Sequence, residues 1–169
     1  MKNLKKYLFA TLMCISAIAF NSTYAQGTVS TEDFEILNNT SWEGTLTYLD
    51  YQTSELVPIA TTMQMKITNN LFEQNVQYTW EPHKNILSKT KIRKKGRFLG
   101  KQKVIEKFMR DDGILQIVTS YTGKDDNKKA TFYVTYEFNE NSYKVKKEVQ
   151  FEDSDERFMR NSYSYVRIK

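Results

Sequence analysis

Cysteine and histidine are almost absent from this sequence, whose 169 residues contain one of each, Cys14 and His83. One cysteine cannot form an intramolecular disulfide, and one histidine excludes a metal site built from several histidines. The sequence also contains no nucleophile elbow, no phosphate-binding loop and no paired-histidine helix motif. We therefore expect no catalytic activity, no metal and no cofactor. His83 follows Pro82 in a predicted turn, so we interpret it as an exposed loop residue rather than a haem ligand.

Long apolar runs are equally scarce. The one clear run, residues 7–20, is shorter than the roughly 20 residues that a transmembrane helix needs. Lys2, Lys5 and Lys6 precede it, and a short polar stretch that ends at Ala25 follows it. A basic start, an apolar centre and a small residue at the end are typical of a secretory signal peptide. We predict a signal peptide over residues 1–25 and an exported product, periplasmic or extracellular, that is soluble after cleavage.

Cys14 lies inside this apolar run and not at its end. A cysteine at the cleavage site would indicate a bacterial lipoprotein, but apolar residues continue after Cys14 as far as Phe20. We interpret Cys14 as part of the segment that is removed. Residues 26–169 are then expected to form a single domain, which has to be stable without a disulfide.

Charge is unevenly distributed along the chain, whose formal net charge is +5. Residues 84–103 contain nine basic side chains and no acidic one, with Lys91, Arg93, Lys94 and Lys95 in the densest part. One interpretation is an exposed hairpin that its lysines keep soluble. The other is a surface that contacts an anionic glycan or lipid. Specific nucleic-acid binding is not expected, because Phe98 is the only aromatic residue among these basic ones.

Apolar and polar residues alternate along most of the chain, which is typical of half-buried strands. Phe132, Val134, Tyr136 and Phe138, for example, fall on one face of one predicted strand. The pattern and the turn residues between the segments predict nine strands, at 42–51, 56–68, 71–80, 86–94, 98–109, 113–122, 129–139, 142–152 and 157–168. Before them, residues 31–37 are predicted to form a short helix that the Thr31 hydroxyl caps.

Consecutive strands joined by short turns predict an antiparallel meander. A flat sheet of this width would leave two edges unpaired and one apolar face uncovered, and closure into a barrel removes both problems. We therefore predict an all-β fold, an antiparallel up-and-down β-barrel of about 8–10 strands with a short N-terminal helix. A two-sheet β-sandwich is the alternative.

The sequence Ser41-Trp42-Glu43-Gly44, which follows the predicted helix, resembles the start of the first strand in the lipocalin-like, or calycin, group of β-barrels. The chain is similar in organisation to the small secreted bacterial members of this group. The resemblance implies that Trp42 packs beneath the helical lead-in at a closed end of the barrel. It also implies that an arginine of the last strand, Arg160 or Arg167, covers the indole.

The chain departs from the lipocalin pattern in two places. Lipocalins carry a glycine two residues before the tryptophan, where this chain has Thr40, while Gly44 lies two residues after Trp42. Lipocalins also carry a helix after the barrel, for which this chain has no room. The resemblance therefore implies the fold more strongly than a function.

Aromatic residues are abundant, and four of them, Tyr78, Trp80, Tyr133 and Tyr136, are our candidates for the lining of a ligand pocket. Such residues can equally fill a core. Two hypotheses follow. In the first, the protein binds a small hydrophobic or amphipathic ligand inside an open barrel. In the second, it is an envelope structural or interaction protein whose barrel is filled and whose basic hairpin contacts an anionic surface.

Overall fold

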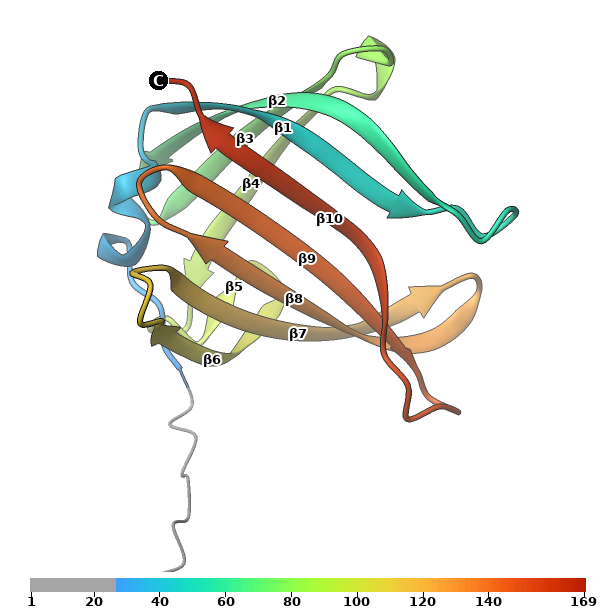
Figure 1. Cartoon of the computed structure of the whole chain (residues 1–169). Coiled ribbons are helices and arrows are strands. Elements are labelled where there is room, and N and C mark those ends of the chain that lie inside the picture. Colours follow the sequence, from blue (N-terminus) through green and yellow to red (C-terminus); the bar gives the residue numbers. More distant parts are fainter. Residues whose placement is uncertain (1–26) are drawn as a thin grey trace, which may run out of the picture.

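A computed structural model describes residues 27–169, so the predicted signal peptide lies outside the described residues. Two short 3-10 helices and ten strands make up the fold (Figure 1). The elements are η1 (Glu32–Leu37), β1 (Thr40–Leu49), β2 (Leu56–Thr68), β3 (Leu71–Tyr78), η2 (Pro82–Lys84), β4 (Ile86–Arg93), β5 (Phe98–Leu99), β6 (Gln102–Met109), β7 (Leu115–Asp125), β8 (Lys128–Phe138), β9 (Ser142–Phe151) and β10 (Phe158–Arg167). Within residues 27–169, no helix is long and apolar enough to cross a membrane.

The ten strands form a closed antiparallel barrel in which each strand pairs with its neighbours along the chain. The first and last strands close it, because β1 pairs with both β2 and β10. Trp42 shows this closure directly, since it lies opposite Met63 on one side and Arg167 on the other. The predicted up-and-down β-barrel is confirmed, and the sandwich alternative is not observed. Figure 1 shows β1 and β10 side by side.

The predicted strand at 98–109 is interrupted, which gives ten strands where the pattern predicted nine. Gly100 has a φ of +62°, a conformation that glycine adopts without steric cost, and the chain turns there between β5 and β6. The two-residue β5 is all that joins β4 to β6. The residue pattern gives little warning of this turn, because apolar and basic residues continue on both sides of Gly100.

The alternation along the strands separates the inner from the outer face of the barrel. In β2, the side chains of Met63, Met65 and Ile67 are buried while the residues between them are exposed. The same period of two runs through β7 and β8, as expected for strands with one face on a core. At the seam, Gly44 lets β1 approach β10 closely, because a Cβ there would lie 2.0 Å from the Ser164 carbonyl oxygen.

The lead-in before β1 is a 3-10 helix, so the predicted helix is correct in place and wrong in type. The Thr31 hydroxyl makes no capping hydrogen bond. The Asp33 carboxylate instead holds the chain just before the helix, because it accepts the backbone N–H of Ser30 at 2.7 Å and pairs with Lys107 Nζ at 3.0 Å. Six residues are too few for a stable α-helix, and burial of Phe34 and Leu37 under the barrel decides their conformation.

Candidate ligand cavity

Side chains fill the end of the barrel that η1 covers. The Phe34 ring lies 4.5 Å from the Phe72 ring and 5.5 Å from the Phe138 ring, measured between centroids. Phe138, Leu37 and Trp42 are completely buried. A void of about 30 Å³ remains below η1, room for one or two water molecules. This end is therefore a packed core and not a binding site.

A short hydrogen-bond chain joins Trp42 to the lead-in. The indole N–H of Trp42 donates to the Thr40 hydroxyl at 2.7 Å, and that hydroxyl donates to the Leu37 carbonyl oxygen at 2.6 Å. Thr40 thus occupies the position of the lipocalin glycine and satisfies both a buried indole and the end of η1. The sequence departs from the family pattern here, and the structure supplies the reason.

The two arginines expected near Trp42 lie in different places. Arg167 is opposite Trp42 in the register, but its guanidinium is exposed and donates to the carbonyl oxygens of Lys169 and Glu140. Arg160 lies at the far end of β10, over the Tyr51 ring at 4.4 Å. Neither makes a cation–π contact with the indole among the described residues, and the Tyr143 ring lies beside it instead, at 6.1 Å.

The other half of the barrel encloses a cavity of about 230 Å³. Five tyrosines line it: Tyr78, Tyr136, Tyr143, Tyr163 and Tyr165. The rest of the lining is Met63, Gln74, Val76, Ile86, Ser88 and Val145. No charged side chain of the described residues is part of this lining. The volume lies just below the usual range of roughly 300–1,000 Å³ for ligand pockets, so the cavity suits a small, uncharged or weakly polar molecular body.

The tyrosine hydroxyls lie in a hydrogen-bond network around the cavity. Tyr143 accepts from Gln74 Nε2 at 2.9 Å, and Tyr165 accepts from the Thr61 hydroxyl at 3.2 Å. The hydroxyls of Tyr78 and Tyr163 lie 2.8 Å apart, and one donates to the other. A tyrosine that only accepts still has its own proton to donate. The cavity therefore offers several hydroxyl donors to anything that lies within it.

Burial raises the pKa of four of these tyrosines, Tyr136, Tyr143, Tyr163 and Tyr165. Loss of solvent raises the pKa of Tyr136 and of Tyr165 to about 12, and the hydrogen bond that Thr61 donates to Tyr165 offsets part of the rise at Tyr165. Burial likewise raises the pKa of Tyr143 and Tyr163 well above the ordinary value of 10. At physiological pH the lining therefore consists of neutral hydroxyls, which donate hydrogen bonds without carrying charge.

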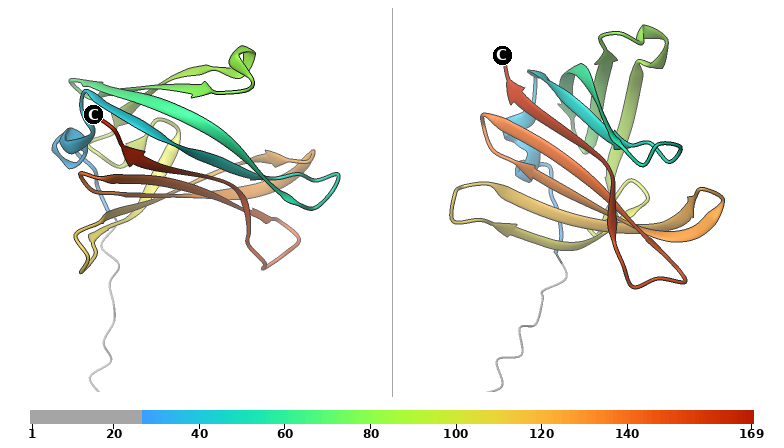
Figure 2. Two further views of the ribbon diagram at one scale, coloured as in Figure 1. Left: turned by 45° about the horizontal axis from the view of Figure 1, so that its top comes forward. Right: turned by 45° about the vertical axis from the view of Figure 1, so that its right-hand side comes forward.

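The barrel wall is incomplete beside this cavity. β4 pairs with β5 only at Ile92 and Arg93, and β6 pairs with β7 only up to Ser120. Consequently no ladder of hydrogen bonds joins residues 86–90 of β4 to residues 121–125 of β7, and Figure 2 shows these strands diverging. Ile86 and Ser88, which line the cavity, come from this stretch of β4, which pairs with β3 on one side only.

Of the four aromatic residues expected to line a pocket, Tyr78 and Tyr136 line the cavity, whereas Trp80 and Tyr133 do not. Trp80 is 82% exposed in the loop after β3. Tyr133 lies on the outer face of β8, where the Arg157 guanidinium covers its ring at 3.4 Å. The period of two explains this correction, because Tyr133 and Tyr136 are three residues apart and an unbroken strand points them to opposite faces.

Three further tyrosines line the cavity that were not among the four candidates, Tyr143, Tyr163 and Tyr165. A usable signal was present, because Tyr143 and Val145 fall on the apolar face of their predicted strand, and Tyr163 and Tyr165 share one face of the next. That signal identifies an inner face. It does not say which inner positions border a cavity, since this depends on how far η1 fills the barrel.

Charged residues cluster at the mouth of the barrel, opposite η1. The Tyr51 hydroxyl donates to Asp125, and Arg160 Nε lies 3.5 Å from the same carboxylate. Arg160 also donates to the Leu49 carbonyl oxygen. Together these contacts connect the β1–β2 turn, the end of β7 and the start of β10. Lys147 of β9 faces the interior nearby, and burial lowers its pKa.

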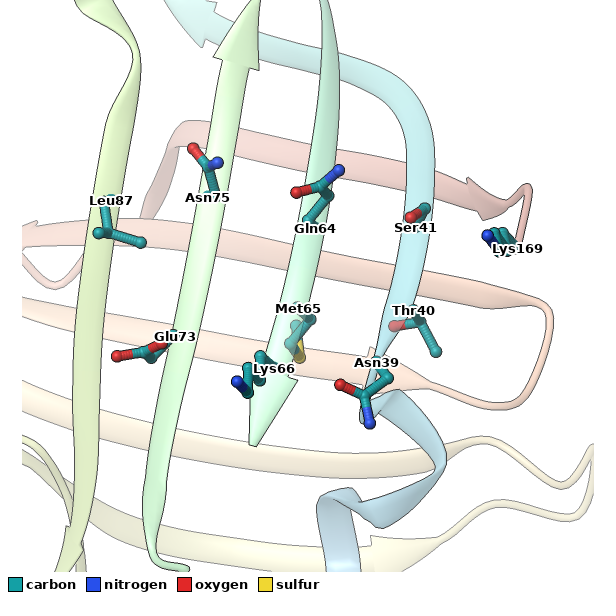
Figure 3. A pocket seen from close by; sticks show the side chains of 10 residues that line it. All are labelled: Asn39, Thr40, Ser41, Gln64, Met65, Lys66, Glu73, Asn75, Leu87 and Lys169. Carbon is teal, nitrogen blue, oxygen red and sulfur yellow. The ribbon is translucent and has the colours of Figure 1, made fainter. Parts of the chain in front are cut away.

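A hollow of about 420 Å³ lies on the outer face over β1 to β4 (Figure 3). Its lining includes the polar side chains of Gln64, Lys66, Glu73 and Asn75, which alternate with the buried ones of the same strands. Glu73 pairs there with Lys89 at 2.6 Å. These are solvated partners on an outer sheet face, so we assign the candidate site to the interior cavity.

The four basic residues singled out in the sequence are all exposed. Lys91 and Arg93 lie on the outer face of β4, while Lys94 and Lys95 form the turn that follows, and none of the four makes an ion pair with another of the residues 27–169. His83 is exposed in η2. In the described part of the chain, no group of three or more histidine, cysteine or carboxylate side chains is arranged to hold a metal ion.

A closed up-and-down barrel with a plugged end and an interior cavity is consistent with a lipocalin-like barrel. No protein-family model matches the sequence, and a search of curated proteins found no match. Among solved structures, the chain is similar to the S-type phycobiliprotein lyase CPES from Guillardia theta, at 12% sequence identity and a TM-score of 0.49. The alignment covers 83% of this chain and 94% of the lyase chain.

Proposed function

We propose that this protein is an exported carrier of one small amphipathic molecule, which it holds in the tyrosine-lined cavity. The observation that supports this most directly is a cavity of about 230 Å³ inside a barrel whose other half is filled. A filled interior throughout would have favoured a purely structural role. Export rests on the basic and apolar start of the sequence, which is typical of a signal peptide.

The residues that line the cavity indicate the chemistry of the ligand's body, which is the part of the ligand that lies inside the cavity. Aromatic and aliphatic side chains favour an apolar or aromatic body, which would gain about 25 cal/mol for each Å² of apolar surface it buries. The hydroxyls of Tyr143 and Tyr165 each have a proton to donate, so the body should carry a hydrogen-bond acceptor such as a carbonyl or ether oxygen. The absence of charged lining residues disfavours a charge at this position.

A fluorescence titration with the uncharged probe N-phenylnaphthylamine tests this function. The purified protein should bind the probe saturably. Val76→Phe, which places a ring in the cavity, should weaken binding at least tenfold, whereas Leu87→Phe on the outer face of β4 should leave it unchanged. Ser88→Phe fills the same cavity and replaces Val76→Phe if that variant does not fold.

Two results would reject the proposal: no saturable binding to the wild-type protein, or equal losses in Val76→Phe and Leu87→Phe. Native mass spectrometry of the purified protein adds an independent measurement. A co-purified small molecule that is present in the wild type and absent from Val76→Phe would also lead to the identity of the natural ligand.

The exposed basic residues favour a second candidate function, contact with an anionic glycan. Lys91, Arg93, Lys94 and Lys95 extend from one edge of the barrel without acidic partners among the described residues. Such a group attracts polyanions, and the attraction falls as salt screens it.

Retention on a heparin column tests this second function. Reversal of all four charges to glutamate should abolish salt-sensitive retention, while reversal of four other exposed lysines should reduce it only slightly. The control lysines are Lys124, Lys128, Lys129 and Lys144. Retention that does not depend on salt, or that both variants lose equally, would exclude a specific role for these four residues.

A further inference from the structure

Lys147 occupies an unusual position, on the inner face of β9 just beyond the tyrosine-lined cavity. It follows the cavity residue Val145 by two residues, which places its Cα about 7 Å further along the strand. Its partners in the register are Val134 on β8 and Asn161 on β10, neither of which carries a charge. The side chain is half-buried. A lysine in such a place normally has an acidic partner.

No carboxylate of the described residues lies within ion-pair distance of Lys147. The nearest acidic group that affects it is Asp125, and Asp125 is already engaged. Arg160 balances its charge from 3.5 Å, and the Tyr51 hydroxyl donates to it as well. Arg160 and Lys147 therefore both lie near the Asp125 carboxylate, which makes its ion pair with Arg160. Lys147 itself makes no ion pair with another of the residues 27–169.

A partly desolvated cation without a partner is unfavourable unless something supplies a negative charge. Burial lowers the pKa of Lys147, and repulsion by Arg160 acts in the same direction, while Asp125 opposes both. An anion bound next to Lys147 would remove this cost and would form a charge-assisted hydrogen bond.

We propose that the ligand is an amphipathic organic anion, whose carboxylate or similar acidic group pairs with Lys147 while its aromatic or apolar body fills the tyrosine-lined cavity. This inference rests on the proposed function of the cavity. It specifies that the acidic group lies on the mouth side of the part of the body that contacts Val145. Lys147 thereby selects acids over alcohols and esters of the same shape.

Two fluorescent probes with the same aromatic body test the inference: anilinonaphthalene sulfonate, which is anionic, and N-phenylnaphthylamine, which is neutral. The wild-type protein should bind the anionic probe about tenfold more tightly. Lys147→Met should abolish this difference and leave the affinity for the neutral probe unchanged, and Lys147→Arg should preserve it. Lys146→Met is the matched control, because Lys146 faces outward and pairs with Glu148 at 3.2 Å.

The outcomes separate the two proposals. If the wild-type protein binds both probes equally, or if Lys147→Met and Lys146→Met weaken the anionic probe to the same degree, the acid-selective role of Lys147 is wrong and the cavity function stands. If neither probe binds the wild-type protein, the carrier function itself is wrong. Loss of the preference in Lys147→Met alone supports both.

Discussion

The two halves of this barrel are built from the same strands and differ in what fills them. Below η1 the void measures about 30 Å³, whereas toward the mouth the cavity measures about 230 Å³. Gln74, Tyr136 and Tyr143 border both spaces and separate them. A barrel of this size can be filled by its own side chains or can hold one small ligand. In this barrel one end is filled and the other is hollow. The reason is that Phe34 and Leu37 of η1 occupy one end only.

The halves also differ in their polar groups. In the filled half, one threonine satisfies the indole of Trp42 and the end of η1. In the hollow half, tyrosine hydroxyls line the space and retain protons for a ligand. On the proposed function, the filled half provides stability and the hollow half holds the ligand.

The seam that both halves share is expected to be the most sensitive position. Gly44→Ala would place a Cβ 2.0 Å from the Ser164 carbonyl oxygen, so β1 and β10 could not pair at their present distance. We expect a loss of more than about 4 kcal/mol in the free energy of unfolding, measured by urea denaturation. Gly113→Ala is the control, because a Cβ there meets nothing within 4 Å although its φ is +77°. Equal stability of the two variants would contradict a tight seam.

The difference in packing can be measured with one truncation in each half. Trp42→Ala empties a completely buried site and should cost about 3–5 kcal/mol. Ile86→Ala, at the rim of the cavity, should cost less than about 1 kcal/mol because its side chain is already 48% exposed. Urea denaturation of both variants gives the comparison. Similar losses would mean that the two halves contribute equally to stability.

Alkaline conditions should affect the hollow half first. The pKa of Tyr165 is raised by burial to about 12 from an ordinary value of 10. Above pH 10 the unfolded chain therefore loses its phenolic proton while the folded chain keeps it, so this stabilisation is complete below pH 10 and declines as pH rises toward 12. Each pKa unit corresponds to about 1.4 kcal/mol, so Tyr165 should account for roughly 2 kcal/mol of the decline.

Denaturation of the wild type and of Tyr165→Phe between pH 9 and pH 12 tests this expectation, with phenolate absorbance as a second readout. The phenylalanine variant should lose less stability with pH than the wild type, and Tyr133→Phe on the outer face should behave like the wild type. An identical pH dependence in all three proteins would show that Tyr165 does not stay neutral in the folded state.

Sequence patterns predicted the strands well and the site only in part. Alternation is a local property, so the ranges of β2, β7 and β8 could be read from the chain. Tyr133 was assigned to the pocket by residue type, although its spacing from Tyr136 already indicated the opposite face. The expected positions of Arg160 and Arg167 came from a resemblance and not from the register. The structure places the two arginines at opposite ends of β10.

Lys147 shows most clearly what a one-dimensional pattern omits. In the sequence the period of two places Lys147 on the same face as Tyr143 and Val145, and Lys146 on the opposite face. Only the closed barrel shows that Lys147 lies beside a cavity, and only the pairing of Asp125 with Arg160 shows that the nearby carboxylate is already engaged.

By itself, the sequence determined an all-β meander with a short lead-in, because a period of two and a set of turn residues dictate strands wherever one face must be buried. It also excluded disulfides within the domain and sites of several histidines, because composition limits chemistry directly. The tertiary structure alone decided where the barrel is filled, which tyrosines surround the cavity and which lysine lacks a counter-charge. These features depend on contacts between residues far apart in the chain, and such contacts exist only once β10 has closed on β1.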